Sequence, residues 1–174
     1  LVGMLTPIVK ARKGKESIDF YSLKDFNAWN EVNGKGYSTK YYKGLGTSTP
    51  AEAKEYFKNL KTVVYKGDTD EAKLAIDLAF GKAKDSANHR KDWLKGYDAN
   101  STLDYNKKEV PVQDFVHRDL IHFSNSDNIR SIASGIDGFK PSQRKVLFGC
   151  LKRKLTNEIR VAQLAGYISE HCAY

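Results

Sequence analysis

The chain has little cysteine and no long hydrophobic segment. Its two cysteines, Cys150 and Cys172, lie too far apart for paired metal-ligand spacing, so we expect neither a zinc site nor a disulfide framework. No apolar run approaches the roughly 20 residues that a transmembrane helix needs, which excludes membrane insertion. Since no signal peptide is recognisable, the sequon at residues 100–102 predicts no glycosylation, and we expect an intracellular protein.

Acidic residues are too few to balance the basic ones. Against 29 Lys and Arg residues stand 21 Asp and Glu residues, so the net charge is +8. Residues 138–160 contain seven basic residues and one acidic residue, Glu158, and therefore carry +6 of this excess. A local charge of this size favours a polyanionic partner such as nucleic acid. The alternative is a basic helix face that is only solvated.

Residues suited to metal chemistry are also scarce. Two of the four histidines, His117 and His122, lie five positions apart rather than the three or four that one helix face requires. The other two, His89 and His171, show no ligand spacing either. No cluster of Asp and Glu suits two-metal catalysis. The sequence therefore predicts no metal site within the chain.

The first part of the chain predicts strands followed by a helix. Apolar residues at 5–9, around Pro7, predict one buried strand, and residues 18–21 predict another. Residues 37–42, YSTKYY, alternate as a third strand, with the odd-numbered and even-numbered side chains on opposite faces. At residues 49–52, TPAE forms a capping box that begins a helix over 50–60. Its expected apolar stripe contains Ala53, Tyr56, Phe57 and Leu60.

A short glycine-containing turn, Gly44-Leu45-Gly46, joins this third strand to the helix. Its backbone N–H groups could bind a phosphate, with Lys40 and Lys43 adding positive charge. Taken alone, an ordinary strand-to-helix turn is the preferred interpretation, because the full spacing of a nucleotide-binding loop is missing.

Beyond Gly67 the pattern becomes helical. Two helices are predicted over 70–82 and 85–95, and a polar loop over 97–109 follows them. A third helix is predicted from Pro111 to the turn-forming residues 124–127.

The last part of the chain predicts two helices separated by a brief turn. The first is a basic helix over 141–154, with Val146, Leu147, Cys150 and Leu151 inside, and the second begins at Ile159 and runs to the end of the chain without interruption. This pattern resembles a helix-turn-helix, so a phosphate-binding helix is the favoured interpretation of the basic stretch.

Three segments of the chain closely resemble type II DNA topoisomerases of eukaryotes and large DNA viruses. They are KYYKGLGTSTPAEAKEYF at 40–57, FSNSDNIRSIASGIDGFKPSQRKVLF at 123–148 and VAQLAG at 161–166. Related bacterial enzymes carry the lysine-glycine motif and the DGxKPxxR motif on separate subunits. Both motifs in one chain therefore indicate the fused type.

The resemblance implies a mixed α/β fold and an internal fragment of a longer enzyme. Residues 1–66 would form the C-terminal part of a TOPRIM domain, 67–108 a helical connector, and 109–174 the start of a winged-helix (helix-turn-helix) domain. The family cleaves and religates DNA through a phosphotyrosyl intermediate. The chain lacks both the acidic DxDxDG motif and the nucleophilic tyrosine, so we expect it to be inactive alone.

The resemblance also implies which residues act on DNA. Arg130 in SNSDNIRSI and Lys140 in DGFKP match cations that support catalysis at the scissile phosphate. The residues expected to contact DNA are Lys40, Lys43, Arg90, Lys91, Lys140, Arg144, Lys145 and Tyr174.

Cofactors and partners follow from the same resemblance. The parent enzyme would use Mg²⁺ and ATP, neither of them bound by this chain, and would act on double-stranded DNA as a homodimer. It would work in the nucleus if cellular, or in the host cytoplasm or a viral factory if viral. The alternative is a free-standing winged-helix module that binds DNA without catalysis.

Overall fold

The computed structural model describes residues 1–42 and 45–174, which fall into two units, Leu1–Ile121 and His122–Tyr174. The first unit contains two three-stranded sheets with their helices, and the second consists mainly of helices. No helix within the described ranges is long and apolar enough to span a bilayer. In chain order the elements are β1 (Val2–Leu5), β2 (Val9–Lys13), β3 (Glu16–Phe20), α1 (Leu23–Asn33), β4 (Ser38–Tyr41), η1 (Leu45–Thr47), α2 (Pro50–Lys58), β5 (Lys61–Lys66), α3 (Asp70–Phe80), α4 (Ser86–Lys95), β6 (Glu109–Pro111), α5 (Val112–Phe115), η2 (Val116–Leu120), α6 (Ile121–Ser131), α7 (Pro141–Lys152) and α8 (Val161–His171).

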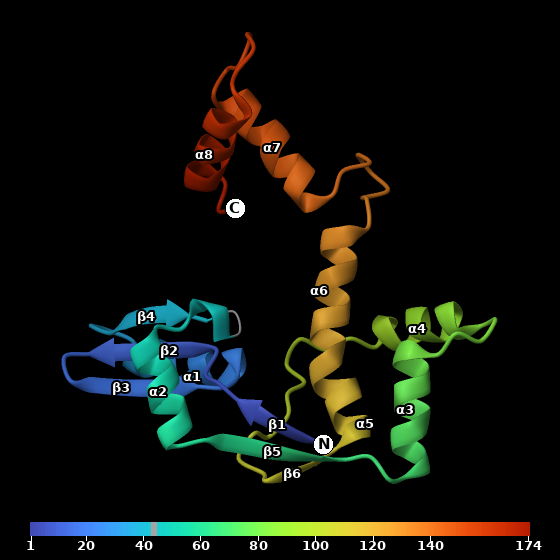
Figure 1. Ribbon diagram of the computed structural model, residues 1–174. Helices are drawn as coiled ribbons and strands as arrows, with labels where there is room; N and C mark the ends of the chain where they lie inside the picture. The colour runs from blue at the N-terminus through green and yellow to red at the C-terminus, as the bar shows by residue number, and fades with distance from the viewer. Residues whose placement is uncertain (43–44) are drawn as a thin grey trace. The chain divides into compact units, whose positions relative to one another are not determined.

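One sheet has the strand order β3-β2-β4, is antiparallel throughout and packs against α1 and α2 (Figure 1). Side chains of β2 alternate between its faces. Val9 and Ala11 are fully buried in a cluster with Phe26 of α1. Lys10 and Arg12 point to the other face, where they contact side chains of α2. This sheet therefore has an apolar face and a polar face, each covered by a helix.

The alternation predicted for residues 37–42 is confirmed. Tyr37 and Tyr41 lie on the α1 face, with ring centroids 4.9 Å from Trp29 and 5.8 Å from Phe26 respectively. Lys40 lies on the α2 face, opposite Lys10 in the register of β4 and β2.

The second sheet has the order β1-β5-β6, with β1 antiparallel and β6 parallel to β5. Its core contains Val63, Val110 and Leu103, the last of which comes from the predicted polar loop. The predicted helices that follow β5 are confirmed as α3 and α4, and the Thr69 hydroxyl caps α3 by accepting from the backbone N–H of Ala72 at 3.2 Å.

Two element predictions are wrong. The single strand expected around Pro7 is two strands in different sheets, since β1 ends at Leu5 and β2 begins at Val9. Proline has no N–H to donate to a sheet, so it separates them. The helix expected to end at residues 124–127 continues to Ser131, because Asp127 accepts hydrogen bonds from Arg130 and Ser131 one turn further along α6.

Two predicted apolar stripes and one predicted helix end also differ from the structure. On α2, Phe57 is 67% exposed, because the helix turns Glu52 and Tyr56 to the polar face of the sheet. Leu60, which is 48% exposed, lies beyond the end of the helix at Lys58. On α7, the side chains expected inside are half-buried or exposed: Val146, Leu147, Cys150 and Leu151. The last helix ends at His171, with Cys172 as its C-cap.

Helices α7 and α8 pack together in the second unit, as the predicted helix-turn-helix requires. Gly149 of α7 is buried at this contact. A Cβ atom added to Gly149 would lie 2.0 Å from Cδ1 of Ile168 on α8, so the glycine permits the close approach of the two helices.

Contacts between residues divide the described chain into two units after Ile121, which lies within the predicted winged-helix segment, 109–174. Strand β6, which begins at Glu109, pairs with β5 in the first unit. The predicted domain boundaries after residues 66 and 108 stay predictions.

Candidate nucleic-acid interface

The N-terminus of α7 presents Lys140, one of the two residues predicted to support catalysis. Pro141 occupies the first turn, where its missing N–H costs nothing. The backbone N–H of Lys140 donates to Oε1 of Gln143 at 2.9 Å and so closes the helix start. The side chain of Lys140 is attached at the positive end of the helix and the residue is exposed, which suits contact with an anion.

Arg144, one turn along α7, is held by Asp137. Its Nε and Nη2 atoms donate to the two carboxylate oxygens at 2.7 Å and 2.9 Å, and Nη2 also reaches the carbonyl of Phe139 at 3.4 Å. These hydrogen bonds from Arg144 hold the pKa of the Asp137 carboxyl well below its usual range. The bidentate pair fixes the loop before α7 and leaves the Arg144 side chain 46% exposed.

Arg130, the other residue predicted to support catalysis, lies in the last turn of α6. Its Nη2 atom forms an ion pair with Asp127, and this hydrogen bond lowers the pKa of the Asp127 carboxyl. The Arg130 side chain is 62% exposed. A carboxylate therefore orients the guanidinium while leaving it accessible to a phosphate.

Lys145 and Tyr174, both predicted to contact DNA, are brought together at the end of α8. The Lys145 ammonium donates to the carbonyl of Ala173 at 2.9 Å and lies 6.0 Å from the centroid of the Tyr174 ring. Tyr174 itself is 70% exposed. The second unit thus carries Arg130, Lys140, Arg144 and Tyr174 exposed and Lys145 half-buried.

Arg90 serves the structure of the first unit. Its Nη1 atom donates to the carbonyls of Leu78, Ala79 and Gly81 at 3.4, 3.5 and 3.0 Å. These carbonyls lie at the C-terminal end of α3, where they lack helical partners. Arg90 is half-buried, whereas its neighbour Lys91 is exposed on α4. The proposed contacts of both residues with DNA stay predictions.

Lys40 is tied to a carboxylate on the polar face of the first sheet. Its Nζ atom lies 3.1 Å from Oε2 of Glu52 and 4.6 Å from the centroid of the Tyr42 ring. Lys43, the other lysine predicted to contact DNA here, lies outside the described residues.

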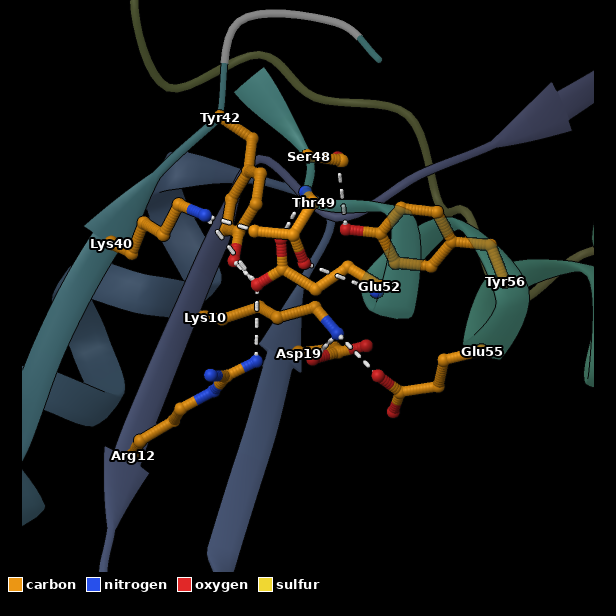
Figure 2. A network of polar contacts seen from close by, with 10 residues as sticks. All are labelled: Lys10, Arg12, Asp19, Lys40, Tyr42, Ser48, Thr49, Glu52, Glu55 and Tyr56. Atoms are coloured by element: carbon orange, nitrogen blue, oxygen red, sulfur yellow. Dashed lines mark hydrogen bonds and ion pairs between the residues drawn. The ribbon is translucent and has the colours of Figure 1, made fainter. Parts of the chain in front are cut away.

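Glu52 is the centre of a polar network that sequence analysis missed (Figure 2). The predicted capping box is confirmed, because the Glu52 carboxylate accepts from the Thr49 backbone N–H at 2.8 Å and the Thr49 hydroxyl accepts from the Glu52 N–H at 3.3 Å. The same carboxylate also accepts from Arg12 at 3.1 Å and from the Tyr42 hydroxyl at 2.5 Å. Glu52 is only 5% exposed.

Lys10 forms a second centre of this network. The residue is 1% exposed, and its ammonium lies 3.4 Å from Asp19 and 3.3 Å from Glu55. The Tyr56 ring centroid is 4.9 Å away. Burial would lower the pKa of Lys10, but the two carboxylates outweigh it and raise the pKa. The sequence signal was the alternation of basic residues in β2, which places Lys10 and Arg12 on one face.

Acid should destabilise the first unit through Glu52. Burial would raise the pKa of this carboxyl, but hydrogen bonds from Tyr42, Thr49 and Lys40 lower it from 4.5 to about 2. The ionised form therefore stabilises the fold above about pH 4.5, and this contribution, on the order of 3 kcal/mol, is lost as the pH falls through about 2.

Urea denaturation of the chain at about pH 5.5 and about pH 2 measures this loss. Glu52→Gln, which cannot ionise, serves as the reference for the other carboxylates. We expect the wild type to lose more free energy of unfolding than Glu52→Gln over this interval. Equal losses would contradict the lowered pKa.

The chain is similar in sequence to known proteins. A family model of the C-terminal associated domain of TOPRIM matches residues 4–128, and a model of the DNA gyrase/topoisomerase IV A subunit matches residues 130–174. The chain is 49% identical over 184 residues to DNA topoisomerase 2 of Candida albicans and 46% identical over 181 residues to DNA topoisomerase 2 of Saccharomyces cerevisiae. The chain belongs to the type II DNA topoisomerase family. Both alignments cover 100% of this chain and 12% of the topoisomerase.

A solved topoisomerase structure shares the fold. The crystal structure of the Plasmodium falciparum topoisomerase II DNA-binding, cleavage and re-ligation domain superimposes with a TM-score of 0.80 at 44% sequence identity. The match covers 99% of this chain and 24% of that domain. The mixed α/β fold, with the C-terminal region of a TOPRIM domain, is therefore confirmed as that of a type II topoisomerase.

Proposed function

We propose that this chain binds the DNA backbone and stabilises the scissile phosphate within an ATP-dependent type II DNA topoisomerase. Such an enzyme changes DNA topology by transient double-strand cleavage, strand passage and religation. The match over 99% of the chain to a DNA-binding, cleavage and re-ligation domain carries the proposal. The exposed cations of the second unit, in a chain of net charge +8, support it.

In the proposed reaction, a tyrosine outside this chain attacks a backbone phosphorus. A bond forms from the tyrosine oxygen to phosphorus as the bond to a deoxyribose oxygen breaks, and religation reverses both changes. Negative charge increases on the phosphate oxygens in the transition state. Arg130 and Lys140 would neutralise that charge, and the Asp127 ion pair would orient the Arg130 guanidinium beforehand.

Magnesium and ATP belong to the parent enzyme in this proposal. When bound, Mg²⁺ would stabilise charge on the attacking and leaving oxygens. The described residues contain no group of three or more His, Cys, Asp or Glu side chains that could hold a metal ion, so this part of the protein does not fit one. The role proposed for the chain's own residues is therefore electrostatic and positional.

Double-stranded DNA and a second copy of the enzyme are the proposed partners. The test is topological: the full-length enzyme should relax supercoiled plasmid and separate interlinked circles only when ATP and Mg²⁺ are both present. DNA binding without any change in topology would instead support the winged-helix binding module. Relaxation that does not depend on ATP would also contradict the proposal.

Lys145→Ala should weaken DNA binding for all sequences alike. A lysine that contacts a phosphate releases about one counterion, so its loss should reduce the slope of log affinity against log salt concentration by about one unit. Fluorescence anisotropy of the full-length enzyme with duplex DNA at several salt concentrations measures the slope.

The matched control for that experiment is Lys73→Ala. Lys73 is also a helical lysine, but it is exposed, pairs with Asp70 on α3 and is not predicted to contact DNA. An unchanged slope for Lys145→Ala, or equal changes in the two variants, would support a basic α7 face that is only solvated.

A further inference from the structure

We infer that Glu52 is a positioning residue that holds Lys40 in place for contact with the DNA backbone and locks β4 against the start of α2. The inference rests on the proposed function. Glu52 receives contacts from three separate segments, since Arg12 lies on β2, Lys40 on β4, and Thr49 immediately before α2. One buried carboxylate thereby joins two strands to a helix (Figure 2).

Both carboxylate oxygens of Glu52 are fully used. Oε1 accepts from Arg12 at 3.1 Å and from the Tyr42 hydroxyl at 2.5 Å, while Oε2 accepts from Lys40 at 3.1 Å and from the Thr49 N–H at 2.8 Å. A capping glutamate needs only the last of these contacts and normally remains at the surface. The three further donors and the burial of Glu52 exceed what helix capping requires.

The charges around Glu52 favour a role in positioning a cation over a role in the long-range attraction of DNA. The cations Lys10, Arg12 and Lys40 are matched by the carboxylates of Asp19, Glu52 and Glu55. A neutral group of charges adds little to the long-range attraction of DNA. Such a group can, however, hold one of its cations in a fixed position. The Lys40 side chain is still 45% exposed on the edge strand β4.

Preorganisation gives this arrangement a consequence for catalysis. An ammonium that is already held in place loses little freedom when a phosphate arrives, whereas a released lysine side chain must be ordered during the reaction. Loss of Glu52 would therefore free Lys40 and Arg12 for loose contacts with DNA while removing their fixed geometry. DNA cleavage should then fall without any loss of DNA affinity.

Glu52→Gln in the full-length enzyme tests this prediction. Glutamine keeps the size of the side chain and an acceptor for Tyr42 or Thr49 but removes the negative charge. We expect duplex affinity to be unchanged or higher, because one negative charge is lost, and the rate of DNA cleavage to fall about tenfold. A folding defect would lower affinity and cleavage together, so this experiment distinguishes a positioning role of Glu52 from a purely structural one.

Two further variants make the test specific. Glu55→Gln removes the same charge one turn along α2 but leaves every Glu52 contact in place, and its cleavage rate should match the wild type. Tyr42→Phe removes one donor to Glu52 while keeping both ion pairs, so it should fold and cleave DNA about two- to threefold more slowly.

Three results would overturn the inference: wild-type cleavage by Glu52→Gln, equal loss of affinity and cleavage in that variant, or equal effects of Glu52→Gln and Glu55→Gln. If Glu52→Gln does not fold, Tyr42→Phe decides, and wild-type cleavage by it would be contradictory. Failure of the wild-type enzyme to cleave DNA would refute the proposed function itself.

Discussion

Replacing Arg130 by alanine should lower the rate of DNA cleavage by the full-length enzyme about a hundredfold, with DNA affinity reduced by no more than about threefold. The guanidinium is proposed to act where charge develops on the reacting phosphate. Removing a donor of this kind acts mainly on the transition state, because the ground-state duplex is held by many other phosphate contacts.

The position of Arg130 explains why the expected effect is large. The residue lies in the last turn of α6, and its ion pair with Asp127 orients a side chain that is 62% exposed. Arg130→Lys should recover only part of the cleavage rate, since an ammonium cannot reproduce the paired donors of a guanidinium.

Arg118→Ala provides the matched control for Arg130→Ala, because Arg118 is an exposed arginine of η2 without a proposed role in DNA binding. Cleavage should be measured under single-turnover conditions and binding by anisotropy, so that chemistry and affinity are separated. Equal losses of affinity and cleavage in Arg130→Ala would assign this residue to general backbone binding.

Lys10→Ala should reduce the free energy of unfolding of the chain by about 3–5 kcal/mol. The lysine is 1% exposed, with Asp19 and Glu55 at 3.4 and 3.3 Å. Its removal leaves a cavity and two carboxylates without their shared partner. The loss is measured by urea denaturation, monitored through the fluorescence of Trp29. The ring centroid of Trp29 lies 5.0 Å from that of Phe20.

Two comparisons make the Lys10 result interpretable. Lys66→Ala removes a lysine whose ion pair with Glu109 is exposed, 53% and 62% for the two side chains, and should cost less than about 1 kcal/mol. Lys10→Met fills the cavity and should recover part of the stability. A loss as small as that of Lys66→Ala would show that the Lys10 ion pairs contribute little.

Local sequence patterns predicted those elements that are determined by residues close together in the sequence. Alternation identified both faces of β4, and the sequence TPAE identified the start of α2. The polar side of the first sheet was not recognisable, because Lys10 and Glu52 become buried, and Arg12 pairs with Glu52, only when β2 and α2 meet across the fold. A charged residue in isolation indicates exposure, and tertiary contact reverses that expectation here.

Other elements were missed because tertiary context overrides local preference. Helix α1 and strands β5 and β6 were not predicted, although KTVVYK at β5 is rich in β-branched residues. The serine-rich run that suggested a turn is helical, since Asp127 accepts side-chain hydrogen bonds within α6. The resemblance to the topoisomerase family supplied the candidate cations, whose ion pairs only the structure reveals.

Trapping of a covalent protein–DNA complex tests the central claim most directly. The full-length enzyme is incubated with supercoiled plasmid and Mg²⁺ and then denatured with detergent. We predict linear plasmid with protein attached through a phosphotyrosine, in amounts that Arg130→Ala reduces sharply. Intact plasmid released without attached protein, under conditions where the enzyme binds DNA, would contradict the role of this chain in DNA cleavage.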